Sequence, residues 1–255
     1  MSARPLPEGD RDAVLRIERQ DDRVVATLNR PERRNAIDQA TIDALHLLCA
    51  ELEAIPRILI LSGAGGVFAS GADIAELRDR RADDARRGIN ANAFIRIAEL
   101  PMPVIAALDG YALGGGAELA YAADIRIATP RLRIGNPETG LGIIAAAGAS
   151  WRLKEIVGDA RAAELLLTGR AIDAEEAREI GLVSELHPVD ELLPAAHAIA
   201  DRIARNDPAA TIATKRVFRA PREAHPAVDL DAQAELFESP EKHRRMTEFL
   251  ERKKR

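Results

Sequence analysis

The stretch DGYALGGGAELAYAAD, residues 109–124, joins an apolar segment, three consecutive glycines and a short alanine-rich run. The apolar segment is typical of a strand and the alanine-rich run of a helix. Glycine permits a tight turn between them and leaves the backbone open to close approach. The stretch therefore predicts a strand-to-helix junction with the carboxylate of Glu118 in the first helical turn.

Strand and helix patterns precede this junction. Residues 13–29 alternate apolar and polar side chains around a QDD turn, which predicts a hairpin with one buried face. Residues 38–55 carry apolar side chains at helical spacing, and residues 57–71 return to strand character before breaking at glycine. Residues 72–100 predict one or two helices with a charged middle, and residues 102–113 predict the next buried strand.

The pattern changes towards the end of the chain. Residues 124–135 predict two short strands around a proline turn, whereas strand signals end near residue 187 and helical patterns follow. We therefore expect a coil of ββα units rather than a doubly wound sheet. The expected organisation is a flexible N-terminus at 1–12, a core at 13–205 and a helical C-terminal region at 206–255.

Composition limits the function classes. The 255 residues are 47% hydrophobic, enough for a sizeable core, but no apolar run reaches the roughly 18 residues of a membrane span. A net charge of −5 and 3% aromatic residues argue against a nucleic-acid partner. No signal-peptide pattern is seen, so we expect a cytoplasmic protein without a membrane partner. The single cysteine, Cys49, is expected to pack within a helix.

Several kinds of catalytic site lack their motifs. The histidines show no HxxxH or HExxH spacing, and GxSxG, GxGxxG and GxxxxGK are missing. Two strand-to-helix junctions remain, at residues 71–72 and 114–116, and helix N-termini there would present free N–H groups. From the residues alone, these junctions are equally explained by a Ser70–Asp73 capping box and by tight glycine packing. Glu118 and Glu138 are likewise open to solvated or capping roles.

Five blocks, in this order, resemble the enoyl-CoA hydratase/isomerase family, also called the crotonase superfamily. The similarity covers about residues 13–220, and its blocks are LNRPERRNAI (28–37), FASGADIAEL (68–77), PVIAALDGYALGGGAELAYAADIRIA (103–128), GNPETGLGI (135–143) and LLLTGRAIDAEEAREIGLVSELHP (165–188). The resemblance implies an α/β fold, a right-handed spiral of ββα units with a C-terminal helical oligomerisation region. It also implies a homotrimer or a dimer of trimers.

The resemblance further implies roles for individual residues. The N–H groups of Ala72 and Gly115 match the family's oxyanion hole for a thioester oxygen. Glu118 matches the base that activates water, and Glu138 matches the acid that protonates C2 of a 2-trans-enoyl-CoA. The residues expected around the CoA thioester are Gly71, Ala72, Asp73, Ile74, Gly114 and Gly115. No metal or redox cofactor is implied, because CoA enters as part of the acyl-CoA substrate.

Two alternatives to a hydratase stay open. One is another reaction of the same family, chiefly the shift of a double bond from C3 to C2, and the other is a non-catalytic binding protein on the same fold. The family's hydratases commonly read PGAGGTQRL after the second glutamate, whereas this chain has AAAGASWRL at residues 145–153. Trp151 and the alanines are therefore expected to alter the acyl pocket or the packing beneath it. The basic cluster in residues 242–255 is a candidate for binding CoA phosphates.

Overall fold

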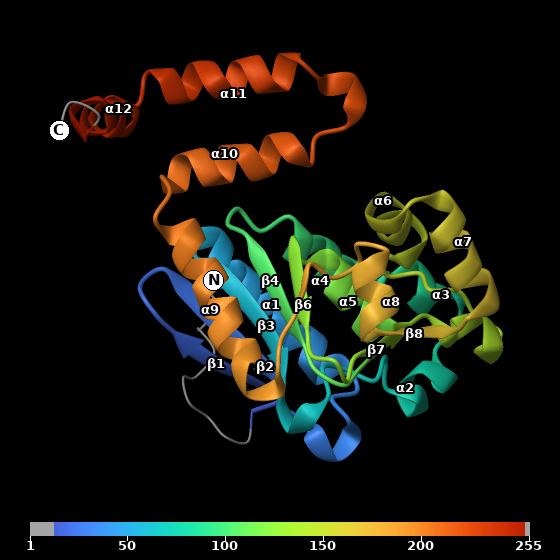
Figure 1. Ribbon diagram of the computed structural model, residues 1–255. Coiled ribbons are helices and arrows are strands. Elements are labelled where there is room, and N and C mark those ends of the chain that lie inside the picture. Colours follow the sequence, from blue (N-terminus) through green and yellow to red (C-terminus); the bar gives the residue numbers. More distant parts are fainter. Residues whose placement is uncertain (1–12, 253–255) are drawn as a thin grey trace. The chain divides into compact units, whose positions relative to one another are not determined.

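The computed structural model describes residues 13–252, and Figure 1 shows its helices and strands. The chain folds into two compact units, Met1–Ala200 and Asp201–Arg255. The expected flexible segment at residues 1–12 lies outside the described residues.

The first unit is built on a six-stranded sheet of order β1-β2-β3-β4-β6-β9. Its strands are β1 (Leu15–Arg19), β2 (Arg23–Leu28), β3 (Ile58–Gly63), β4 (Val104–Leu108), β6 (Ile125–Ala128) and β9 (Glu185–Leu186). Strands β1 and β2 form the antiparallel hairpin predicted from their alternating side chains, with Leu15 opposite Leu28. The other pairings are parallel, and β2, β3 and β4 are almost completely buried, as parallel strands usually are.

A second, smaller sheet corrects one prediction. It has the order β5-β7-β8, with β5 (Tyr111–Leu113), β7 (Arg133–Gly135) and β8 (Ala171–Asp173). Residues 102–113 were expected to form one strand, but they form β4 and β5 in different sheets. Gly110 makes the corner with a φ of 63°, and a Cβ there would lie 2.2 Å from the carbonyl oxygen of Gly66. Only glycine fits this corner, from which the chain enters the second sheet.

The charged segment at residues 72–100 forms three helices, rather than the expected one or two. They are α2 (Ile74–Asp79), α3 (Ala82–Arg86) and α4 (Ile89–Ala98). Arg80 adopts an extended conformation after α2, and Gly88 adopts a left-handed conformation with a φ of 61° before α4. Helices α2 and α3 bury no side chain, so no apolar stripe joins them into one longer helix.

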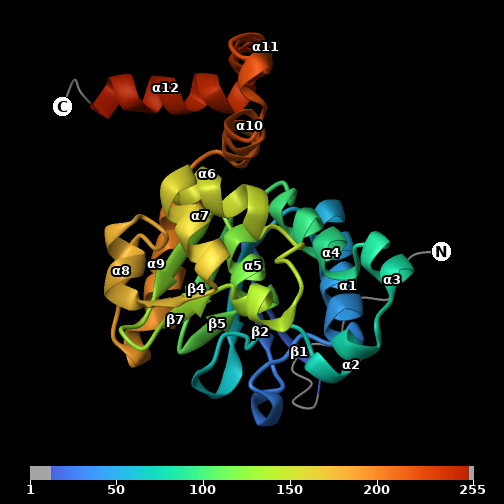
Figure 2. The ribbon, with the colours of Figure 1, turned by 90° about the vertical axis from the view of Figure 1, so that its right-hand side faces the viewer.

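The remaining helices of the first unit complete the core. They are α1 (Gln39–Ala54), α5 (Gly115–Ala122), α6 (Lys154–Val157), α7 (Asp159–Thr168), α8 (Ala174–Glu179) and α9 (Leu192–Ala204), the last of which crosses the boundary at Ala200. Helix α1 buries four side chains of the predicted apolar stripe, Ile42, Leu45, Leu48 and Leu52, and lies beside α4 in Figure 2. The fifth, Ile55, follows the helix and is 61% exposed. Cys49 is fully buried in α1, and this burial raises the pKa of its thiol to about 12. Packing is therefore its structural role.

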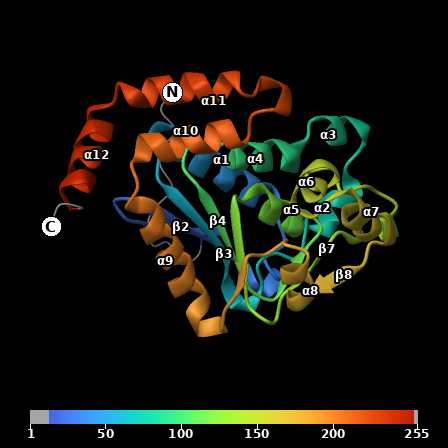
Figure 3. The ribbon, with the colours of Figure 1, turned by 45° about the horizontal axis from the view of Figure 1, so that its top comes forward.

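The second unit contains α10 (Pro208–Phe218), α11 (Ala227–Phe237) and α12 (Pro240–Arg252), shown in Figure 3. Large apolar side chains remain exposed on all three helices, including Phe218 at 83% and Phe249 at 58%. Within the basic cluster, Arg244 pairs with Glu241 and Glu248, while residues 253–255 lie outside the described part. None of the helices in residues 13–252 is long and apolar enough to cross a membrane.

Candidate active site

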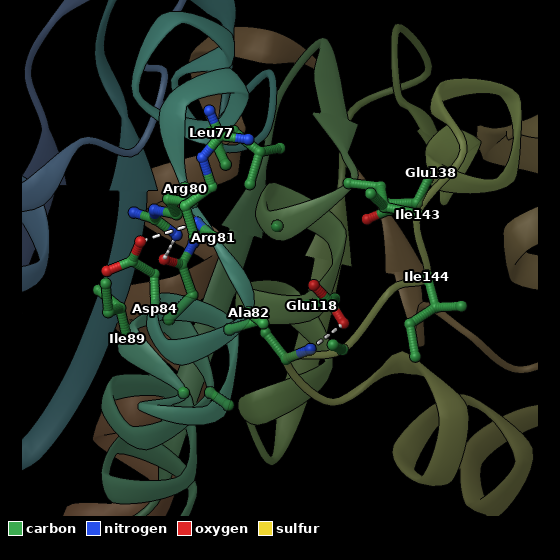
Figure 4. Close-up of a pocket in the computed structure, with 18 residues that line it drawn as sticks. Leu77, Arg80, Arg81, Ala82, Asp84, Ile89, Glu118, Glu138, Ile143 and Ile144 are labelled. Carbon is green, nitrogen blue, oxygen red and sulfur yellow. Dashed lines mark hydrogen bonds between the residues drawn. The ribbon is translucent and has the colours of Figure 1, made fainter.

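A cavity of about 760 Å³ in the first unit brings together four of the residues singled out in the sequence. Ala72, Gly115, Glu118 and Glu138 all line it. In Figure 4, Glu118 lies between a wall that includes Leu77 and Arg80 and a wall that includes Glu138 and Ile144. The lining is mainly apolar with a few polar groups, which is the usual character of a small-molecule site.

Two backbone N–H donors meet at this cavity. Ala72 is held by a parallel bridge to Ile37, in which the Ile37 N–H donates to Gly71 O at 2.8 Å and the Asp73 N–H donates to Ile37 O at 2.9 Å. Gly115 begins α5, and a Cβ on it would lie 3.5 Å from the Ala72 nitrogen. Within residues 13–252, neither the Ala72 nor the Gly115 N–H has a hydrogen-bond acceptor. Both N–H groups are therefore unpaired at the cavity, and their role in binding one oxygen atom stays a prediction.

The other residues expected around a thioester lie beside the cavity and do not line it. Gly71 and Gly114 adopt φ angles of 112° and 51°, and their two turns are close together, because a Cβ on Gly71 would lie 3.1 Å from Leu113 O. A Cβ on Gly114 would lie 3.1 Å from Glu138 Oε1, so glycine here makes room for that carboxyl. Asp73 caps α2 by accepting from the Ala75 N–H at 3.1 Å, and Ile74 is 59% exposed. Their contacts with a substrate stay predictions.

Glu118 is a buried carboxyl held by the backbone. It is 3% exposed, and its Oε1 accepts from the N–H groups of Ala147 at 2.6 Å and Ala149 at 3.1 Å. Burial raises the pKa of Glu118 to about 7, and the neighbouring charge of Glu138 adds to this, whereas the backbone donors oppose it. The group can thus exchange a proton near neutral pH.

Glu138 lies on the 3-10 helix Pro137–Leu141 and is 8% exposed. Burial raises its pKa above the ordinary value, while its own backbone N–H and the Asn136 side chain act in the opposite direction. Asn136 Nδ2 lies 3.5 Å from Oε1, whereas the buried Oε2 has no hydrogen-bond partner among the described residues. Oε1 is therefore at the outer limit of a hydrogen bond from Asn136, and Oε2 is left without a protein partner among the described residues.

Sequence reasoning missed several groups that hold the two glutamates. The backbone donors of Ala147 and Ala149 flank Gly148, which adopts an unusual turn with a φ of 141°. Ala147 lines the cavity as expected of the altered alanine segment, but Trp151 does not and instead lies beside Arg152. Among residues 13–252 no three His, Cys, Asp or Glu side chains are placed to hold a metal ion. The expectation of a reaction without metal or cofactor stays a prediction.

Comparisons with known proteins identify the family to which the chain belongs. The family model described as enoyl-CoA hydratase/isomerase matches residues 18–255. A short-chain-enoyl-CoA hydratase from Clostridium acetobutylicum is 37% identical over 247 residues, which cover 93% of this chain and 95% of the relative.

Solved structures show the same fold. An enoyl-CoA hydratase from Bacillus anthracis has a TM-score of 0.89 at 32% identity, covering 94% of this chain and 96% of that one. A putative enoyl-CoA hydratase from Thermobifida fusca, solved in complex with CoA, has a TM-score of 0.80 at 30% identity, covering 89% and 95%. These similarities confirm the expected crotonase-like fold. The chain belongs to the enoyl-CoA hydratase/isomerase family.

Proposed function

We propose that this protein is an enoyl-CoA hydratase that adds water reversibly to a 2-trans-enoyl-CoA and gives a 3-hydroxyacyl-CoA. Its relatives named as enoyl-CoA hydratases bear out the expectation of a hydro-lyase. The observation that carries the detailed proposal is the meeting of two buried carboxyls and two free N–H donors at one cavity.

The two N–H donors form the proposed oxyanion hole. The thioester oxygen of the substrate accepts hydrogen bonds from Ala72 and Gly115, and negative charge develops on that oxygen as C3 is attacked. Donors aimed at this charge stabilise the transition state, and loss of one such donor typically costs about 3 to 4 kcal/mol. The missing side chain at Gly115 allows the oxygen to approach.

The two carboxyls divide the proton transfers. Glu118 takes a proton from the water whose oxygen bonds to C3, and Glu138 gives its proton to C2. The π electrons of the C2–C3 double bond move into the enolate as the C3–O bond forms, and the enolate then uses them to form the new C2–H bond. Glu118 ends the step protonated and Glu138 ends it ionised. A base must be ionised and an acid protonated, and a pKa of about 7 suits Glu118 to this work at neutral pH.

The substrate supplies CoA itself, and the Thermobifida fusca relative was solved with CoA bound. We extend the proposal to an acyl-CoA ligand in this cavity and to assembly as a homotrimer or a dimer of trimers. The exposed Phe218, Phe237 and Phe249 of the second unit support assembly, because large apolar side chains on a helical surface favour a protein contact. A cytoplasmic location stays a prediction.

The test is turnover of crotonyl-CoA. We expect the conjugated enoyl-thioester absorbance to fall and the product to gain the mass of one water. Glu118→Gln and Glu138→Gln should each lose this activity, whereas Glu155→Gln, a change at an exposed residue of α6, should retain it. Turnover of a 3-enoyl-CoA without water addition would instead identify an isomerase, and no turnover of either substrate would favour a binding protein.

A further inference from the structure

A buried tyrosine lies behind the two glutamates and is not used by the proposed reaction. Tyr121 is 4% exposed and follows Glu118 by one turn of α5. Its hydroxyl donates to Asn136 Oδ1 at 3.0 Å. Burial raises the pKa of this phenol well above its ordinary value, with the charges of both glutamates adding to the effect. The hydroxyl therefore remains a donor throughout the pH range in which the protein works.

The contacts of the Asn136 amide fix which way it is turned. Asn136 is 2% exposed, and its Nδ2 lies 3.4 Å from Gly114 O and 3.5 Å from Glu138 Oε1. Both of those oxygens are acceptors, so they require the N–H₂ side of the amide. A reversed amide would place Oδ1 against a carbonyl and a carboxyl oxygen, so Oδ1 faces the Tyr121 hydroxyl, which donates to it and holds the amide in this orientation.

The orientation of the Asn136 amide determines which oxygen of the Glu138 carboxyl carries the proton. With Oε1 next to the amide donor, the proton of the neutral carboxyl belongs on Oε2, the atom that is buried without a partner among the described residues. We propose that Tyr121 and Asn136 are positioning residues that orient the Glu138 carboxyl and direct its transferable proton to Oε2. The catalytic part of this inference rests on the proposed hydratase function.

Besides Glu138, two other charged side chains interact with the Tyr121 phenol, those of Glu118 and Arg126. Glu118 is the other buried carboxyl nearby, and it shares α5 with Tyr121. Arg126 of β6 acts on the Tyr121 phenol and pairs with the carbonyl oxygens of Ala123 and Leu182. Neither Tyr121 nor Asn136 lines the cavity, so they act on the substrate indirectly, through the Glu138 carboxyl and, for Asn136, also through the Gly114 carbonyl that its Nδ2 contacts.

The first test compares the chain's two tyrosines. Tyr121→Phe removes the hydroxyl and keeps the ring, and Tyr111→Phe does the same at a 45% exposed position on β5. We expect Tyr121→Phe to lower kcat for crotonyl-CoA about ten-fold with little change in KM, because proton transfer is impaired and substrate contacts are kept. Tyr111→Phe should match the wild type in both constants.

Asn136→Asp gives a second, sharper variant. It keeps the shape and the acceptor for Tyr121 but replaces the donor that faces Glu138 with an oxygen. We expect a loss in kcat of at least about a hundred-fold, since the acid can no longer be held in its working orientation. Circular dichroism and size-exclusion chromatography establish that each variant remains folded and assembled.

A titration independent of turnover separates this inference from the proposed function. The carboxyl ¹³C signal of Glu138, identified by its loss in Glu138→Gln, should titrate at higher pH in Tyr121→Phe than in the wild type. An unchanged titration together with wild-type kcat would overturn the positioning role. A wild type that hydrates no enoyl-CoA would refute the proposed function, and the titration would still decide whether Tyr121 controls Glu138.

Discussion

Replacement of Glu118 by glutamine should stabilise the protein while it abolishes activity. Burial raises the pKa of this carboxyl from 4.5 to about 7. The unfolded chain therefore releases the proton at lower pH than the native protein does, and the native state loses stability as the pH rises between these values. Glutamine removes the buried charge, and its side-chain oxygen can still accept from the N–H groups of Ala147 and Ala149.

The size of the effect follows from the shift in pKa. A difference between 4.5 and about 7 makes the charge of Glu118 cost about 1 kcal/mol at pH 5 and about 3 kcal/mol above pH 8. Glu118→Gln should therefore exceed the wild type in unfolding free energy by a margin that grows over this range. Glu118→Ala should gain less, because it leaves two buried N–H donors without an acceptor, at a cost of about 1 to 3 kcal/mol each.

The assay is urea unfolding at pH 5 and pH 8.5, at one fixed protein concentration because assembly also contributes to stability. Glu155→Gln measures the effect of replacing an exposed carboxylate. An equal difference between Glu118→Gln and the wild type at both pH values would show that the Glu118 carboxyl is not shifted, and the reasoning from burial would fail.

Three further predictions follow from the site and the core. The kcat/KM for crotonyl-CoA should fall as the pH drops below about 7, because Glu118 must be ionised to act as a base, and a profile that is flat down to pH 5 would contradict this. Gly115→Ala should fold, because the new Cβ would lie 3.5 Å from the Ala72 nitrogen, an ordinary contact distance. It should lose at least about a hundred-fold in kcat, because the methyl group would occupy the oxyanion site. Gly116→Ala should instead yield little folded protein, because its Cβ would lie 2.3 Å from Ala69 O. Cys49 should react with a thiol reagent only after unfolding, and rapid labelling of the native protein would refute its burial.

Local patterns in the sequence predict those parts of the fold that depend on neighbouring residues. The β1–β2 hairpin and α1 follow from side-chain periods of 2 and 3.6, and the glycine turn before α5 follows from its composition. The corner at Gly110 could not be predicted, because its cause is the approach of the Gly66 carbonyl from a distant loop. The division of residues 72–100 into three helices depends in turn on Arg80 and Gly88, which single-sequence propensity does not resolve.

The candidate site likewise combines residues that a local motif predicts with contacts that form only through tertiary folding. Glu118 and Gly115 are neighbours along the chain, so one motif identifies both. The support for Glu118 comes from Ala147 and Ala149, which reach it only through tertiary folding. The Tyr121–Asn136 hydrogen bond likewise joins a helix to the residue that follows β7, and no local pattern indicates it.

The most direct test of the central claim is the fate of crotonyl-CoA in ¹⁸O-labelled water, followed by mass spectrometry of the CoA thioester. The account predicts that the wild type places one ¹⁸O atom at C3, giving labelled 3-hydroxybutyryl-CoA, and that Glu118→Gln and Glu138→Gln remain folded but form almost none. Label incorporation at the wild-type rate in either variant would remove that glutamate from the mechanism. A wild type that leaves crotonyl-CoA and longer 2-trans-enoyl-CoA substrates unlabelled would contradict the assignment as a hydratase.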